Sequence, residues 1–133
     1  MVFKNKIYVE RDSVCLGDDC NAPNAQNLDY EDDERLSDFI DAVAKYVPTM
    51  REVVWSVSCK DETIAYLIFD ENANYKYELS IQDVKVSDLV EKKLYCRYYY
   101  ERKLLDFHTN PPTDLYPEYT TLFEKVKAHE RRL

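Results

Sequence analysis

The stretch "VVWSVSCKDETIAYLIFDENANYKYELSI", residues 53–81, decides the fold. It contains three apolar runs, "VVWSVSC", "TIAYLIF" and "YKYELSI", which are separated by the polar turns "KDE" and "DENAN". Apolar and polar side chains alternate in the first and third runs, which is typical of strands with one buried face. The middle run is apolar on both faces, which indicates a central strand covered on both sides. Residues 53–81 therefore predict an antiparallel meander of three strands.

A further strand is expected on each side of this meander. In "KIYVERD", residues 6–12, Ile7 and Val9 alternate with more polar neighbours, and "KLYCRYYYE", residues 93–101, also has strand character. A short helical turn capped by Ser87 is expected at 87–91. Residues 13–31 show no periodicity, so we predict a long irregular loop there.

Two helices are predicted. The first begins after Asp32 or Asp33, either of which is a suitable cap, and ends at Pro48. Its apolar residues recur at helical spacing: Leu36, Phe39, Ile40, Val43, Ala44 and Val47. The second has Pro117 in its first turn and an apolar stripe of Tyr119, Leu122, Phe123 and Val126. Together the elements predict a single α+β domain over residues 1–133, with a largely antiparallel sheet of about five strands and two main helices packed mostly on one face.

The charge of the chain narrows the classes of partner. The 133 residues have a formal net charge of −8. Residues 1–50 hold 11 acidic and 5 basic groups, residues 51–90 hold 8 and 4, and residues 91–133 hold 7 and 9. Nucleic acid is a disfavoured partner, because phosphate contacts require a basic footprint. A protein partner with a basic surface is favoured instead.

The compartment is expected to be the cytoplasm. The longest apolar run, Ile64–Phe69, is far shorter than the roughly 18 residues that a membrane-spanning helix needs. Lys4 and Lys6 are not followed by the apolar segment of an export signal. We therefore expect no membrane association, and we expect the four cysteines to be thiols.

The single glycine excludes whole classes of binding loop. Because Gly17 is the only glycine, neither a GxGxxG fingerprint nor a P-loop nor a GxSxG elbow exists in the sequence. No cofactor is therefore expected. Gly17 is interpreted as a turn residue within the 13–31 loop, which then displays Asp18 and Asp19 at its tip.

No metal or catalytic residue is assigned. Four residues separate Cys15 from Cys20, which leaves free thiols, a disulfide pair and zinc ligands open, although a structural zinc needs four ligands. Cys59 and Cys96 are expected to be buried in strands. The amino-terminal carboxylates could bind a hard cation, but their spacing does not match an EF-hand and acidic runs before helices are commonly solvated. These carboxylates are Asp12, Asp18, Asp19, Asp29, Glu31, Asp32, Asp33 and Glu34.

The residues that remain as candidates point to a protein interface. Tyr95, Arg97 and Tyr99 share one face of the predicted strand at 93–101, and Tyr and Arg are enriched at protein interfaces. A helix covering that face is the alternative. The acidic candidates are Asp18, Asp19, Asp32 and Asp33.

The leading hypothesis is a small acidic cytoplasmic protein-binding module, acting as an inhibitor or immunity-type partner of a basic protein. One alternative is a metal-dependent or small-molecule enzyme that uses the amino-terminal carboxylates. Another is a self-associating structural module, a homo-oligomer built on the tyrosine-rich strand at 93–101.

Overall fold

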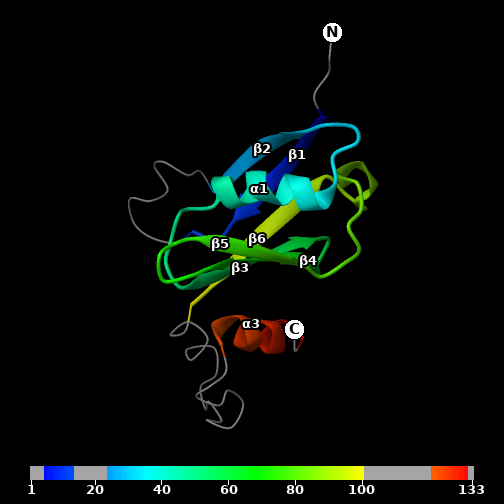
Figure 1. Ribbon diagram of the computed structural model, residues 1–133. Helices are drawn as coiled ribbons and strands as arrows, with labels where there is room; N and C mark the ends of the chain where they lie inside the picture. Colours follow the sequence, from blue (N-terminus) through cyan, green and yellow to red (C-terminus); the bar gives the residue numbers. More distant parts are fainter. Residues whose placement is uncertain (1–4, 14–23, 101–120, 132–133) are drawn as a thin grey trace.

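The computed structural model describes residues 5–13, 24–100 and 121–131, and within these ranges the chain forms a single α+β domain. Its six strands form one sheet in the order β2-β1-β6-β3-β4-β5 (Figure 1). Only the β1–β6 pair is parallel; the other four pairs are antiparallel. The strands are β1 Asn5–Arg11, β2 Ala25–Tyr30, β3 Val53–Cys59, β4 Glu62–Phe69, β5 Tyr75–Leu79 and β6 Lys93–Tyr99. The predicted meander is therefore confirmed as β3-β4-β5.

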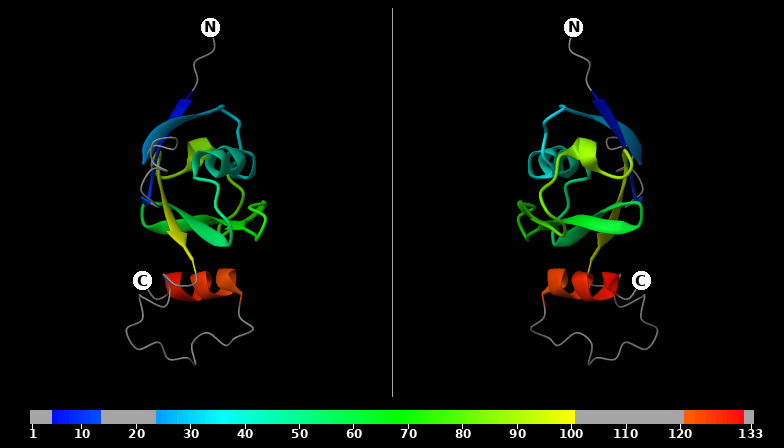
Figure 2. Two further views of the ribbon diagram at one scale, coloured as in Figure 1. Left: turned by 90° about the vertical axis from the view of Figure 1, so that its left-hand side faces the viewer. Right: turned by 90° about the vertical axis from the view of Figure 1, so that its right-hand side faces the viewer.

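Helix α1, Leu36–Tyr46, supplies the main core, and the sheet curves around it (Figure 2). Its predicted apolar stripe is buried, and Leu36 and Val43 are each 0% exposed. The stripe packs in one cluster with Ile7 and Val9 of β1 and with Trp55 of β3. Cys59 and Cys96 are free thiols buried in this same core, as predicted.

Helix α3, Leu122–Glu130, covers the opposite face of the sheet. Val126 packs there in a second cluster with Val54, Tyr66 and Tyr99. The expectation that both helices lie mostly on one face is therefore wrong. Alternation along a strand shows that a face is buried, but not which helix buries it. The two apolar faces of β4 did indicate a strand covered on both sides.

The prediction of an irregular loop over 13–31 is also wrong in part. Residues 14–23 lie outside the described residues, but Ala25–Tyr30 forms strand β2, antiparallel to β1 from Asn5↔Tyr30 to Glu10↔Ala25. β2 is an edge strand, and four of its six side chains are exposed. Exposed positions tolerate polar residues on both faces, so "AQNLDY" lacks the alternation that reveals a strand.

The ends of the helical elements differ from those predicted. α1 begins at Leu36, later than a cap at Asp32 or Asp33 would place it, and Arg35 at its N-cap position makes no capping side-chain hydrogen bond. The turn predicted at 87–91 is the 3-10 helix η2, Val86–Asp88, so Ser87 lies inside it rather than capping it. In α3 the N-cap is Thr121, whose hydroxyl accepts from the Glu124 N–H at 3.2 Å. Pro117 and Tyr119 lie outside the described residues.

Candidate protein-binding surface

Exposed carboxylates surround the amino end of α1. Two segments, 31–38 and 83–88, are joined there by backbone hydrogen bonds from Leu36 N–H to the Val84 carbonyl (2.8 Å) and from Val86 N–H to the Glu34 carbonyl (2.9 Å). Both segments are rich in acidic residues and contain only two cations, Arg35 and Lys85. We call the exposed carboxylates of these segments the acidic patch: Glu31, Asp32, Asp33, Asp38, Asp83 and Asp88.

The two sequence-predicted carboxylates of this region, Asp32 and Asp33, lie in the connection between β2 and α1. Asp32 Oδ1 accepts a hydrogen bond from Asn5 Nδ2 at 2.6 Å. Asp33 Oδ1 lies 3.4 Å from Lys85 Nζ, and its side chain is 92% exposed. Neither side chain is turned into the core, so both keep their charge at the surface.

Asp83 caps α1 from a distant part of the chain. Its carboxylate accepts from the Ser37 N–H (2.9 Å) and from the Ser37 hydroxyl (2.6 Å), while its carbonyl accepts from Arg35 Nη1 at 2.8 Å. An unpaired N–H group in the first turn of a helix needs such an acceptor. These hydrogen bonds from Ser37 lower the pKa of Asp83 below its usual range. Sequence reasoning missed this residue because Asp83 and Ser37 are 46 positions apart in the sequence.

A pH-dependent contribution to stability is expected from Asp83. A carboxylate whose pKa is lowered by folding stabilises the protein above its unfolded pKa, which is about 3.9, and loses this effect as the pH falls through the folded pKa. Asp83→Asn should therefore lower Tm at pH 7, and the gap from the wild type should close as the pH falls below about 4. Thermal denaturation from pH 7 to acid, with Asp61→Asn as an exposed control, measures this gap. A gap that does not change with pH would show that the charge of Asp83 is irrelevant.

Of the three interface candidates on the tyrosine-rich strand β6, Tyr99 is buried and not exposed as the sequence suggested. Tyr99 is 0% exposed, packs edge-on against His129 of α3 at 5.5 Å between ring centroids, and donates its hydroxyl to Glu130 Oε2 at 2.7 Å. The alternative of a helix-covered face is correct for Tyr99. Arg97 is exposed on the same side of the sheet, with Nη1 3.9 Å from Glu130 Oε2.

Tyr95 has a structural role beside the end of β1. Its hydroxyl donates to Asp12, whose second carboxylate oxygen accepts the Tyr98 N–H at 3.2 Å. Burial and this bond to Asp12 raise the pKa of Tyr95 to about 12. Asp12, which the sequence placed among possible cation ligands, thus holds the end of β1 to β6.

Glu130 is the residue on this side of the sheet that sequence reasoning missed. Its side chain is only 9% exposed, and it accepts from the hydroxyls of Thr63 (2.9 Å) and Tyr99. Together with Arg97 it lines a polar cavity of about 460 Å³ that also includes Ser56, Ser58, Asp61 and Thr63. No local pattern points to Glu130, because it stands in the charged run "AHERRL", which is typical of a solvated helix end.

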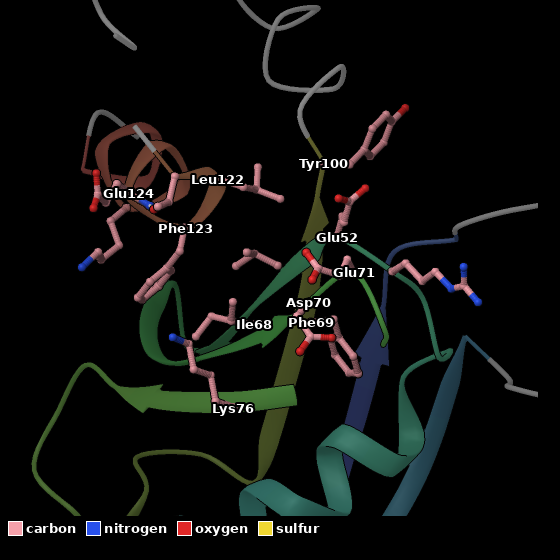
Figure 3. Close-up of a pocket in the computed structure, with 14 residues that line it drawn as sticks. Glu52, Ile68, Phe69, Asp70, Glu71, Lys76, Tyr100, Leu122, Phe123 and Glu124 are labelled. Atoms are coloured by element: carbon pink, nitrogen blue, oxygen red, sulfur yellow. The ribbon is translucent and has the colours of Figure 1, made fainter. Parts of the chain in front are cut away.

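A wider groove of about 1030 Å³ lies between α3 and the sheet (Figure 3). Phe123 lines its α3 side and Ile68 its sheet side. Its rim carries charges of both signs: Arg51, Glu52, Asp70, Glu71, Lys76, Glu124 and Lys127. This mixture gives the groove no preference for a partner of one charge, in contrast to the acidic patch.

The sequence-predicted residues thus divide between two faces. Asp32 and Asp33 belong to the acidic patch around α1, whereas Tyr95 and Arg97 lie on the side of the sheet that α3 covers. Gly17, Asp18, Asp19, Cys15 and Cys20 all lie outside the described residues.

Within the described ranges, no three His, Cys, Asp or Glu side chains come close enough together to hold a metal ion. Neither α1 nor α3 has the length and apolar character that a membrane span requires. Comparison with models of protein families, with curated proteins and with solved structures finds no match to this chain.

Proposed function

We propose that the protein binds a basic protein through the acidic patch and acts as its inhibitor or immunity-type partner. The observation that carries this proposal is the concentration of exposed carboxylates on two adjoining segments that contain only two cations. Charges arranged in this way attract a partner of opposite sign and orient it before contact.

An apolar side chain stands beside these charges. Val90 is 78% exposed, two residues after Asp88, although the preceding Leu89 is buried at 8%. An apolar contact surrounded by polar and charged groups is the arrangement found in protein interfaces, where burial supplies affinity and the rim supplies specificity. Val90 is therefore the proposed apolar anchor, and the patch is its charged surround.

Inhibition would follow from occlusion alone. A basic protein that uses its cationic surface to meet its own target cannot do so while the acidic patch covers that surface. This mode of action needs no chemical step by the bound protein. It also agrees with the exposure of the patch carboxylates, since none of them is turned inward.

The proposal is tested by affinity capture from the native host with three baits: wild type, a patch variant and a control variant. The patch variant carries Asp32→Asn, Asp33→Asn, Asp38→Asn and Asp88→Asn; the control variant carries Glu52→Gln, Asp61→Asn, Glu62→Gln and Glu71→Gln, all exposed and outside the patch. Each variant removes four negative charges and changes the net charge from −8 to −4. We expect wild type and the control variant to capture the same basic protein and the patch variant to lose it. Capture of that protein by all three baits would refute the patch as its binding site.

A further inference from the structure

Among the described residues, β5 forms one edge of the sheet and pairs with no strand on its outer side. It is the last strand in the order β2-β1-β6-β3-β4-β5, and four of its five side chains are exposed. Two of these are large: Tyr75 is 38% exposed and Tyr77 is 43% exposed. An edge strand offers a row of backbone N–H and carbonyl groups to another strand.

The hydrogen bonds that flank β5 show which of its residues face outward. Asp70 N–H donates to the Asn74 carbonyl (2.9 Å), and Ser80 N–H donates to the Ile64 carbonyl (2.8 Å). In an antiparallel pair, hydrogen-bonded residues alternate with residues whose backbone groups point away. Asn74, Lys76, Glu78 and Ser80 therefore bond to β4, and Tyr75, Tyr77 and Leu79 present their N–H and carbonyl groups to the open edge.

We propose that two copies of the chain associate through antiparallel pairing of β5 with β5, in the register that places Tyr77 opposite Tyr77 of the second copy. In this register Tyr75 lies opposite Leu79, so every outward-facing residue meets another outward-facing residue. Lys76 lies opposite Glu78, and the two-fold symmetry of the dimer forms this opposite-charge pair twice. One five-residue strand is thus complementary to itself in backbone hydrogen bonding, in charge and in apolar contact.

In the joined sheet, the apolar and the charged side chains of β5 lie on opposite faces. Tyr75, Tyr77 and Leu79 lie on the face that α1 covers, because they pair with Phe69, Leu67 and Ala65 of the main core. Lys76 and Glu78 lie on the other face, where Glu78 Oε2 is 3.8 Å from Lys127 Nζ. Dimerisation would therefore place the aromatic contacts on one face and the ion pairs on the other.

Neither of the other strands considered fits a second copy as well. The tyrosine-rich β6, on which the sequence-based idea of self-association rested, lies between β1 and β3 and has no open edge. The opposite edge strand, β2, contains Asp29 as its only charged residue and cannot form reciprocal opposite-charge pairs with itself. The β5 dimer does not depend on the proposed basic partner.

Charge reversal tests the register directly. Wild type should show a monomer–dimer equilibrium in sedimentation velocity across a concentration series that reaches the millimolar range. Lys76→Glu places glutamate opposite Glu78, and Glu78→Lys places lysine opposite Lys76, so each single variant should weaken the dimer by about tenfold or more. An equimolar mixture of the two variants restores both opposite-charge pairs and should associate about as tightly as wild type. The double variant should also recover the dimer.

Backbone pairing is tested at Tyr77. Tyr77→Pro removes an N–H that faces the open edge and is not bonded to β4, so the fold should persist while the dimer is lost. Tyr77→Ala keeps the N–H and should retain more of the dimer. Circular dichroism confirms that each variant is folded, and Glu62→Lys serves as a charge-reversal control away from the edge.

A wild type that sediments as a monomer throughout the series overturns the proposal. A dimer that persists in folded Tyr77→Pro, or single variants that fail to associate when mixed, would overturn β5 as the contact. Protection of the Tyr77 amide from hydrogen exchange, increasing with protein concentration, would support it independently.

Discussion

Replacement of Tyr99 by alanine is expected to destabilise the protein by about 3 to 5 kcal/mol, the range typical of removing a fully buried aromatic side chain. Tyr99 is 0% exposed and fills the space between β6 and α3 together with Val54 and Val126. Its loss leaves a cavity there and also removes a donor from the largely buried Glu130 carboxylate, which accepts from the Tyr99 hydroxyl at 2.7 Å. Urea unfolding followed by circular dichroism measures the change in free energy of unfolding.

Two companion variants separate packing from hydrogen bonding. Tyr99→Phe keeps the ring and loses the hydrogen bonds of the hydroxyl, to Glu130 and to Arg97, so about 1 to 3 kcal/mol is expected. Arg97→Ala should change the free energy of unfolding by less than about 1 kcal/mol, since its side chain is 45% exposed and its ion pair with Glu130 is long. If Tyr99→Ala were as mild as Arg97→Ala, Tyr99 would not be the core residue described above.

Removal of charge from the acidic patch is expected to slow association with the basic partner by about tenfold or more at low ionic strength. The patch variant loses Asp32, Asp33, Asp38 and Asp88 as charges, and these lie on segments where only Arg35 and Lys85 oppose them. Attraction between exposed charges accelerates the encounter of two proteins more than it slows their separation. Stopped-flow mixing with the captured partner gives both rate constants.

The control variant isolates position from net charge, because it has the same net charge as the patch variant. Its carboxylates lie just before β3, in the two turns of the meander and at the first residue of β4, so its association rate should stay close to that of wild type. Equal slowing in both variants would mean that overall charge, and not the patch, governs the encounter.

The parts of the fold that could be predicted are the strands and helices whose buried side chains recur at regular intervals in the sequence. The apolar runs of β3 and the stripe of α1 record burial, and both elements lie in the predicted regions, although α1 begins later than its predicted cap and β3 is buried on both faces. β2 leaves no such record because it is an exposed edge strand. The face chosen by α3 is likewise a tertiary property that no local period encodes.

Only those residues of the candidate site that stand in an acidic run of the sequence could be predicted. Asp32 and Asp33 are identifiable as surface carboxylates because they stand in an acidic run before an apolar stripe. Asp83 and Glu130 act through partners far away in the sequence, Ser37 in one case and Thr63 in the other. The hydrogen-bonded junction of segments 31–38 and 83–88, which creates the patch, becomes visible only in the folded chain.

The measurement that tests the central claim most directly is the association rate constant of wild type and the patch variant with the captured partner, followed side by side as salt is raised. Screening shortens the range of exposed charges to about 10 Å at 0.1 M salt and to about 3 Å at 1 M. We expect the wild-type rate to fall steeply, the patch variant to fall much less, and the two to converge at high salt. Two rates that stay equal, or that differ by the same factor at every salt concentration, would contradict recognition through the acidic patch.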